Sequence, residues 1–176
     1  MSFHPATDPS SSSSWLSAHY RVTIARVALY LGALAVLATG VDHIEQYAVD
    51  SYSSVPTIGT LFLLNFISAV VITIGLVAPL RRIAGRFADP IREFMAVSGI
   101  GLAVLSLAAL FISEATSLFG FTEHGYRMAI VVAIVVEVAA AVLLVTFLVA
   151  DDATHQTIHR LSRWFRAERR GQQSRA

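Results

Sequence analysis

The side chains able to do acid–base or metal chemistry gather in two short connections between long apolar stretches. Each connection holds one acidic–histidine doublet, Asp42-His43 in the first and Glu123-His124 in the second. Imidazole nitrogen and carboxylate oxygen are suitable ligands for Zn, Fe or Cu. We therefore consider a candidate metal site that combines both connections, with the members His43, Glu45, Glu114, Glu123 and His124.

The spacing of these residues leaves other interpretations open. Two histidines on opposite helices could instead ligate a b-type haem through its two axial positions. The sequence contains no HExxH and no ExxH motif, so the spacing specifies neither a metal ion nor haem. The remaining interpretation is that these side chains are interfacial polar groups, which satisfy helix ends and contact water.

One ionisable residue, Glu137, interrupts the last apolar stretch of the chain, residues 128–149. Counting nine residues from Met128 places it about 14 Å below the boundary of that stretch. Because a charge at such depth costs about 3 kcal/mol or more, the residue is expected to face the interior of a helix bundle. Ala133 and Ala140 lie on the same helix face, and these small residues favour a packed interface.

Three roles for Glu137 follow from this position. A protonated carboxyl could hydrogen-bond to Asn65 or to a backbone carbonyl and merely tie two helices together. The same group could relay protons or bind a ligand. A third placement would turn it towards lipid or towards a second copy of the chain.

The elements that must position these residues are four apolar segments. A segment of about 20 helical residues crosses the hydrocarbon core of a bilayer, which is about 30 Å thick. Hydrophobic residues make up 55% of the chain and charged residues only 14%, which indicates an integral membrane protein in contact with the lipid bilayer. We predict an all-α, up-down-up-down four-helix transmembrane bundle within one membrane domain, residues 19–150. The predicted spans are about 22–47, 58–78, 95–113 and 128–149.

The first span can be placed in two ways. It runs either over residues 22–41, with Arg26 extending its charge back to the interface, or over residues 27–47. In the second placement Asp42 and His43 lie inside the membrane. Gly32 in this span and Gly99 and Gly101 in the third suit close helix contacts.

The two ends of the chain are polar. Residues 1–18 are rich in serine, and their composition predicts a disordered tail. In the tail 151–176, residues 154–170 place apolar side chains at helical spacing between arginines. This pattern predicts an amphipathic helix on the membrane surface against anionic lipid, and we favour that over nucleic-acid binding.

The arginines predict the orientation. All 13 basic residues are Arg, and 12 of them lie before or at the start of the first span, between the second and third spans, or in the final tail. Because cytoplasmic loops carry the basic excess, both termini are predicted to be cytoplasmic. Loops 42–57 and 114–127 then face outside. The absence of lysine suggests a high-GC bacterial genome, and hence the bacterial cytoplasmic membrane.

Three stretches resemble a group of small, uncharacterised four-span membrane proteins of high-GC bacteria. They are GVDHIEQY at 40–47, SVPTIGTLFLLNF at 54–66 and FGFTEHGYRMAIVVAIVVE at 119–137. The group has no established activity, so the resemblance implies the four-span topology and nothing about chemistry.

The sequence leaves three functional hypotheses. The absence of cysteine, of a GxSxG motif and of a phosphate-binding glycine motif argues against nucleophilic catalysis and nucleotide binding. The first and favoured hypothesis is a non-enzymatic accessory or scaffold protein that binds a membrane protein or a second copy of itself. The second is a metal- or haem-binding protein, and the third a proton-coupled carrier or channel that uses Glu137. A polar cavity around Glu137, Asn65 and His43 would favour the last two, although residue counting places His43 nearer the surface than Glu137.

Overall fold

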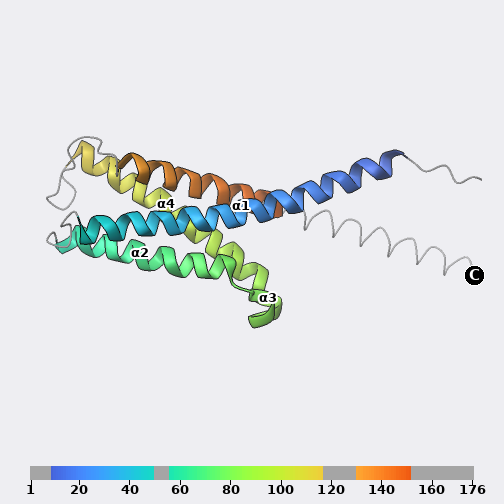
Figure 1. The fold of residues 1–176 in the computed structure, drawn as a ribbon, viewed down its shortest axis with the longest axis horizontal. Helices are drawn as coiled ribbons and strands as arrows, with labels where there is room; N and C mark the ends of the chain where they lie inside the picture. The colour runs from blue at the N-terminus through green and yellow to red at the C-terminus, as the bar shows by residue number, and fades with distance from the viewer. Residues whose placement is uncertain (1–8, 50–55, 117–129, 152–176) are drawn as a thin grey trace, which may run out of the picture.

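The computed structural model describes residues 9–49, 56–116 and 130–151; for residues 9–18, Pro56 and Glu114 it describes the backbone only. Four long helices lie side by side (Figure 1). They are α1 (Pro9–Ala48), α2 (Pro56–Val77), α4 (Ala88–Ala115) and a last helix, Ile130–Asp151. Between α2 and α4 the chain forms two short helical turns, α3 (Leu80–Ile83) and η2 (Gly85–Phe87).

Four segments, one for each long helix, are apolar enough to cross a membrane, and the third includes η2 before α4. These segments are His19–Ala48, Thr57–Val77, Gly85–Ser113 and Ile130–Asp151. Figure 1 shows consecutive spanning helices running in opposite directions, with α3 at the turn between α2 and α4. The predicted all-α bundle of four spans is therefore confirmed. The amphipathic helix predicted for residues 154–170 lies outside the described residues.

The first helix is longer at its N-terminal end than the sequence suggested. It begins at Pro9, so residues 9–18, whose composition predicted no structure, are helical. Proline suits the first turn of a helix, because its missing N–H group would have no intrahelical partner there. At its other end α1 continues to Ala48, so residues 42–47 are helical and do not form a loop.

Small residues allow the helices to approach closely. The most deeply buried apolar residues among those described are Ala33, Val36, Ala69, Leu76, Ala88, Ala96, Ala140 and Leu144. A Cβ atom added to Gly40 would lie 2.7 Å from the Cβ of Ala69, and one added to Gly99 would lie 2.7 Å from Leu144 Cδ1. In contrast, a Cβ atom added to Gly101 would have no described atom from another helix within 4 Å. Close packing of this kind holds helices together in lipid, where the hydrophobic effect between them is lost.

The connection between α2 and α4 is held by Arg92. Its Nε donates to the carbonyl oxygen of Leu76 at 3.3 Å, and its Nη2 donates to that of Ala78 at 3.4 Å. These carbonyls lie at the C-terminal end of α2, where the helix leaves its last acceptors without intrahelical partners. Arg92 thereby fixes the start of α4 against the end of α2.

The outer surface of the bundle is apolar. Large side chains such as Leu34, Val71, Leu105 and Val135 are exposed along the spans. Because backbone polar groups are satisfied within each helix, such a surface is suited to contact with lipid. The structure is therefore that of an integral membrane protein with four spans.

Candidate functional site

One face of α1 places polar side chains inside the bundle. Thr39, His43 and Gln46 follow one another at intervals of four and three residues, which puts them on the same side of the helix. All three are buried. The Thr39 hydroxyl donates to the carbonyl oxygen of Ala35 in its own helix at 3.1 Å. The polar face therefore extends from the middle of α1 towards its C-terminal end.

The imidazole of His43 is held in a defined orientation. Its Nδ1 lies 2.9 Å from the carbonyl oxygen of Thr39. Because a carbonyl oxygen can only accept, Nδ1 carries a proton and donates it, and in the neutral ring Nε2 is then an acceptor. The ring also contacts Phe62 of α2 edge to face, with 5.0 Å between the ring centroids. The acceptor nitrogen is thus directed towards the last helix.

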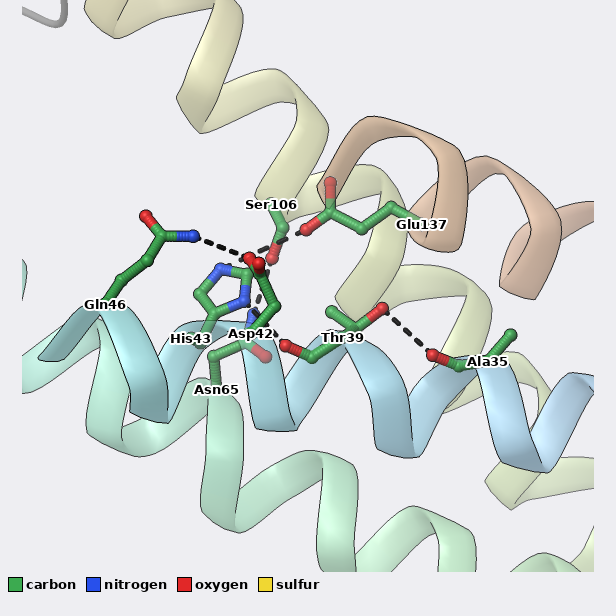
Figure 2. A network of polar contacts seen from close by, with 8 residues as sticks. All are labelled: Ala35, Thr39, Asp42, His43, Gln46, Asn65, Ser106 and Glu137. Carbon is green, nitrogen blue, oxygen red and sulfur yellow. Dashed lines mark hydrogen bonds and ion pairs between the residues drawn. The ribbon is translucent and has the colours of Figure 1, made fainter. Parts of the chain in front are cut away.

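Glu137 faces this nitrogen from the last helix. Glu137 is only 2% exposed, and its Oε1 atom lies 4.0 Å from Nε2 of His43 (Figure 2). This separation is too long for a direct hydrogen bond but close enough for an electrostatic interaction. The carboxylate of Asp42, which accepts from Gln46 Nε2 at 2.5 Å, also acts on Glu137 through its charge. Residue counting had placed His43 nearer the surface than Glu137; because α1 continues to Ala48, the two side chains meet.

Asn65 and Ser106 complete the group from the two remaining helices. Asn65 Nδ2 donates to Ser106 Oγ at 2.6 Å, and the Ser106 hydroxyl is in turn hydrogen-bonded to the carboxyl of Glu137. Asn65 is therefore linked to Glu137 through Ser106 and not by the direct bond considered from the sequence. We call the four residues the polar layer: His43 of α1, Asn65 of α2, Ser106 of α4 and Glu137 of the last helix.

A cavity of about 290 Å³ adjoins the polar layer. All four members line it, together with Gln46. The rest of the wall consists mainly of leucine, isoleucine, phenylalanine and alanine side chains from α2, α4 and the last helix. An apolar pocket with a few converging polar groups is the usual form of a small-molecule site.

Tight packing closes the bundle on one side of the polar layer. A second set of four residues lies seven positions along the chain from the four members of the polar layer. We call it the packing layer: Val36, Ile72, Gly99 and Leu144. A Cβ atom added to Gly99 would come within 3.4 Å of all three other members. Seven residues are two helical turns, or about 10 Å. At that distance from Glu137 the bundle has no room even for a methyl group.

The predicted metal ligands are not brought together in the described part of the chain. Glu45 is exposed, because residues two apart on a helix point in different directions and its neighbour His43 faces inwards. Glu114 lies in the last turn of α4, where only the backbone is described, and Glu123 and His124 lie outside the described residues. Among the described residues no three His, Asp or Glu side chains gather as metal ligands. The five-residue metal site and the haem alternative therefore stay predictions.

Ser106 is the member of the site that the sequence did not indicate. It was assigned only to close packing, as a small residue in an apolar segment. The signal that could have identified it is its spacing of seven residues from Gly99 and from Ser113, which places all three on one face of α4.

No protein-family model, no curated protein and no solved structure matches the chain. The resemblance to small bacterial four-span proteins thus has no matching family behind it, and what stands is the four-span helical architecture. Function must be inferred from the cavity and the polar layer.

Proposed function

We propose that the protein is a proton-linked membrane carrier, in which Glu137 exchanges a proton and the adjoining cavity binds a small, mostly apolar ligand. One observation carries the proposal: the buried Glu137 carboxyl lines a cavity together with polar groups from the three other helices. An accessory or scaffold protein would place this carboxyl in a dry contact between helices. A cavity beside it supports the carrier instead.

The position of the polar layer near one end of the bundle supports proton exchange from that end. His43 lies five residues before the end of α1 and Glu137 seven residues after Ile130, so both are about 8–10 Å from the same end. Among the described residues that face Glu137, the titratable ones are Asp42 and His43 of α1. The facing residues of α2 and α4, Asn65 and Ser106, are neutral. This end is the one that the arginine distribution predicts to face outside.

The packing layer favours a carrier over an open channel. A channel needs a continuous aqueous path, whereas the contacts around Gly99 leave no space two turns beyond Glu137. Passage to the other side would require the helices to move apart at this layer, as alternating access demands.

Proton flux into proteoliposomes tests the proposal. Vesicles that contain a pH-sensitive dye are exposed to a potassium diffusion potential, and internal acidification is followed with wild-type protein, with Glu137→Gln and with protein-free lipid. Because glutamine cannot exchange a proton, we expect the variant to lose at least about tenfold in flux, equivalent to about 1.4 kcal/mol in the barrier.

The matched control is Glu93→Gln, which neutralises an exposed carboxyl near the start of α4. It should conduct like the wild type. Equal flux in wild type and Glu137→Gln, or a wild-type flux no higher than that of protein-free vesicles, would show that the carrier proposal is wrong.

A further inference from the structure

The side-chain oxygen of Asn65 is a buried acceptor without a hydrogen-bond partner in the part of the chain that the structure describes. The residue is 8% exposed, and its amide nitrogen is already used in the bond to Ser106. Buried polar groups are nearly always hydrogen-bonded, because leaving one unsatisfied costs about 1–3 kcal/mol. Since Asn65 lines the cavity, its oxygen indicates a donor supplied by a bound molecule.

Two further acceptors border the same cavity. His43 Nδ1 donates to a backbone carbonyl, so Nε2 of the neutral ring offers a lone pair. The carboxyl of Glu137 lies 4.0 Å from that nitrogen and accepts whenever it is ionised. A ligand head group that satisfies the Asn65 oxygen must therefore donate a hydrogen bond. A head group that only accepts, such as an ether or a ketone, would leave the Asn65 oxygen unsatisfied.

The walls of the cavity indicate the rest of the ligand. Phe62 and His43 both line it, and their rings pack edge to face with centroids 5.0 Å apart. Aromatic side chains in this arrangement favour another aromatic ring at their faces and edges. The volume of about 290 Å³ suits a single ring with a short apolar substituent.

The cavity reaches the lipid-facing surface of the bundle. Three of its lining residues, Leu61 and Leu64 of α2 and Leu105 of α4, are 43%, 52% and 71% exposed. In a membrane these exposed leucines contact lipid, so a molecule dissolved in the bilayer can enter between α2 and α4. The ligand is therefore expected to be membrane-soluble.

We propose that the cavity binds a membrane-soluble phenol, whose hydroxyl donates to the side-chain oxygen of Asn65 while its ring lies against Phe62 and His43. The inference deepens the proposed carrier and rests on it in taking this cavity as the ligand site. It makes a separate claim, however, because binding can be measured without proton transport.

A matched pair of ligands tests the donor directly. Binding of 4-hexylphenol and of 4-hexylanisole is measured by equilibrium dialysis against the full-length protein in lipid nanodiscs, with protein-free nanodiscs to subtract partitioning into lipid. The anisole replaces the hydroxyl hydrogen by a methyl group and so removes the donor. The phenol gives the buried acceptor a hydrogen bond, which the anisole cannot do. We therefore expect the phenol to bind about tenfold more tightly than the anisole. Equal affinities for the two compounds would overturn the proposal.

Two variants assign the preference to Asn65. In Asn65→Leu the acceptor is gone, so the phenol and the anisole should bind equally. Ser68→Ala changes another residue of the cavity wall, one turn along α2, and should keep the tenfold preference. Size-exclusion profiles show whether each variant is folded, and the comparison of the two ligands on the wild type does not depend on any variant. A preference that persists in Asn65→Leu would contradict the role of its oxygen.

The two proposals fail separately. If the wild type shows Glu137-dependent proton flux but no preference for the phenol, the ligand class is wrong and the carrier stands. If the preference is present but the flux is not, the binding site stands and the carrier is wrong.

Discussion

Glu137 would be a costly residue against lipid, and the structure shows how it is accommodated. Each of the other three spans supplies one polar side chain at its level, so the carboxyl meets a hydroxyl and an imidazole instead of hydrocarbon. A buried ionisable group is tolerated when it is neutralised or paired and hydrogen-bonded. Within the polar layer Ser106 has a double role, because it accepts from Asn65 and donates to Glu137.

Replacing Ser106 by alanine should destabilise the protein. Ser106→Ala leaves the Asn65 amide nitrogen buried without its acceptor, which costs about 1–3 kcal/mol. The free energy of unfolding is measured by titrating the detergent-solubilised protein with dodecyl sulfate.

Ser98→Ala is the control on the same helix. Among the described residues, the Ser98 hydroxyl bonds only to the carbonyl oxygen of Phe94 in its own helix, at 2.8 Å. This change should therefore stay within about 0.5 kcal/mol. Similar unfolding free energies for the two variants would contradict the linking role of Ser106.

The site could be predicted from the sequence only in part. The depth of Glu137 in an apolar segment was sufficient to indicate a residue facing the bundle interior, and it is buried there. Its neighbour His43 could not be assigned, because the sequence allowed the first span to end before or after it. Ser106 was missed for another reason: a serine among alanines and glycines is equally suited to helix packing and to hydrogen bonding.

At the level of the helices, a repeat of seven residues relates the polar layer to the packing layer. Seven residues complete nearly two turns, so residues at this spacing share one helix face. Each span thus presents a polar residue to the cavity and, two turns away, a residue that closes the bundle. Gly99 lies at the centre of the packing layer, because it has no side chain and the side chains of the other three members approach it.

Gly40 provides a test of helix packing away from the site. An added methyl group at this position would collide with the Cβ of Ala69 at 2.7 Å, and neither atom can move without its backbone. We therefore expect Gly40→Ala to lower the free energy of unfolding by about 1–3 kcal/mol. Dodecyl sulfate titration again gives the value.

Gly101→Ala is the matched control, because in the described part of the chain no other helix comes within 4 Å of the added methyl group. Alanine has the higher helix propensity, so this variant should be unchanged or more stable by up to about 1 kcal/mol. If Gly40→Ala proved as stable as Gly101→Ala, the close contact between α1 and α2 would not be present.

The four spans were predictable because each is a long apolar run with few charges. The ends of the helices were less predictable, because a helix can continue beyond the hydrocarbon core of the membrane, where its polar turns contact water. The third span was predicted to begin at residue 95, whereas α4 begins at Ala88, in the polar connection that Arg92 fastens to α2. At the N-terminus the serine-rich residues 9–18 extend α1 for the same reason.

Among the described residues, the polar layer and the arginines lie towards opposite ends of the bundle. The polar layer lies near the ends of α1 and α4 and the start of the last helix, whereas Arg81, Arg86 and Arg92 lie at the α3 end. The arginine rule predicts that the α3 end is cytoplasmic, which would place the cavity in the outer half of the membrane. Proton exchange would accordingly begin from outside.

Cysteine labelling tests this orientation, and the chain has no native cysteine to interfere. We expect Thr57→Cys, at the exposed start of α2, to react with a membrane-impermeant maleimide on intact cells. Ile83→Cys, in the exposed α3 turn, should react only after lysis. The reverse pattern would place the cavity in the cytoplasmic half of the membrane.

The central claim is that the Glu137 carboxyl exchanges a proton inside the bundle, and infrared spectroscopy of the protein in lipid tests it most directly. The carboxyl C=O stretch is recorded through a pH titration for the wild type and for Glu137→Gln, and the two series are subtracted. The account predicts one titrating carboxyl band in the difference, shifted when 4-hexylphenol is added. Identical spectra for the two proteins at every pH would contradict it.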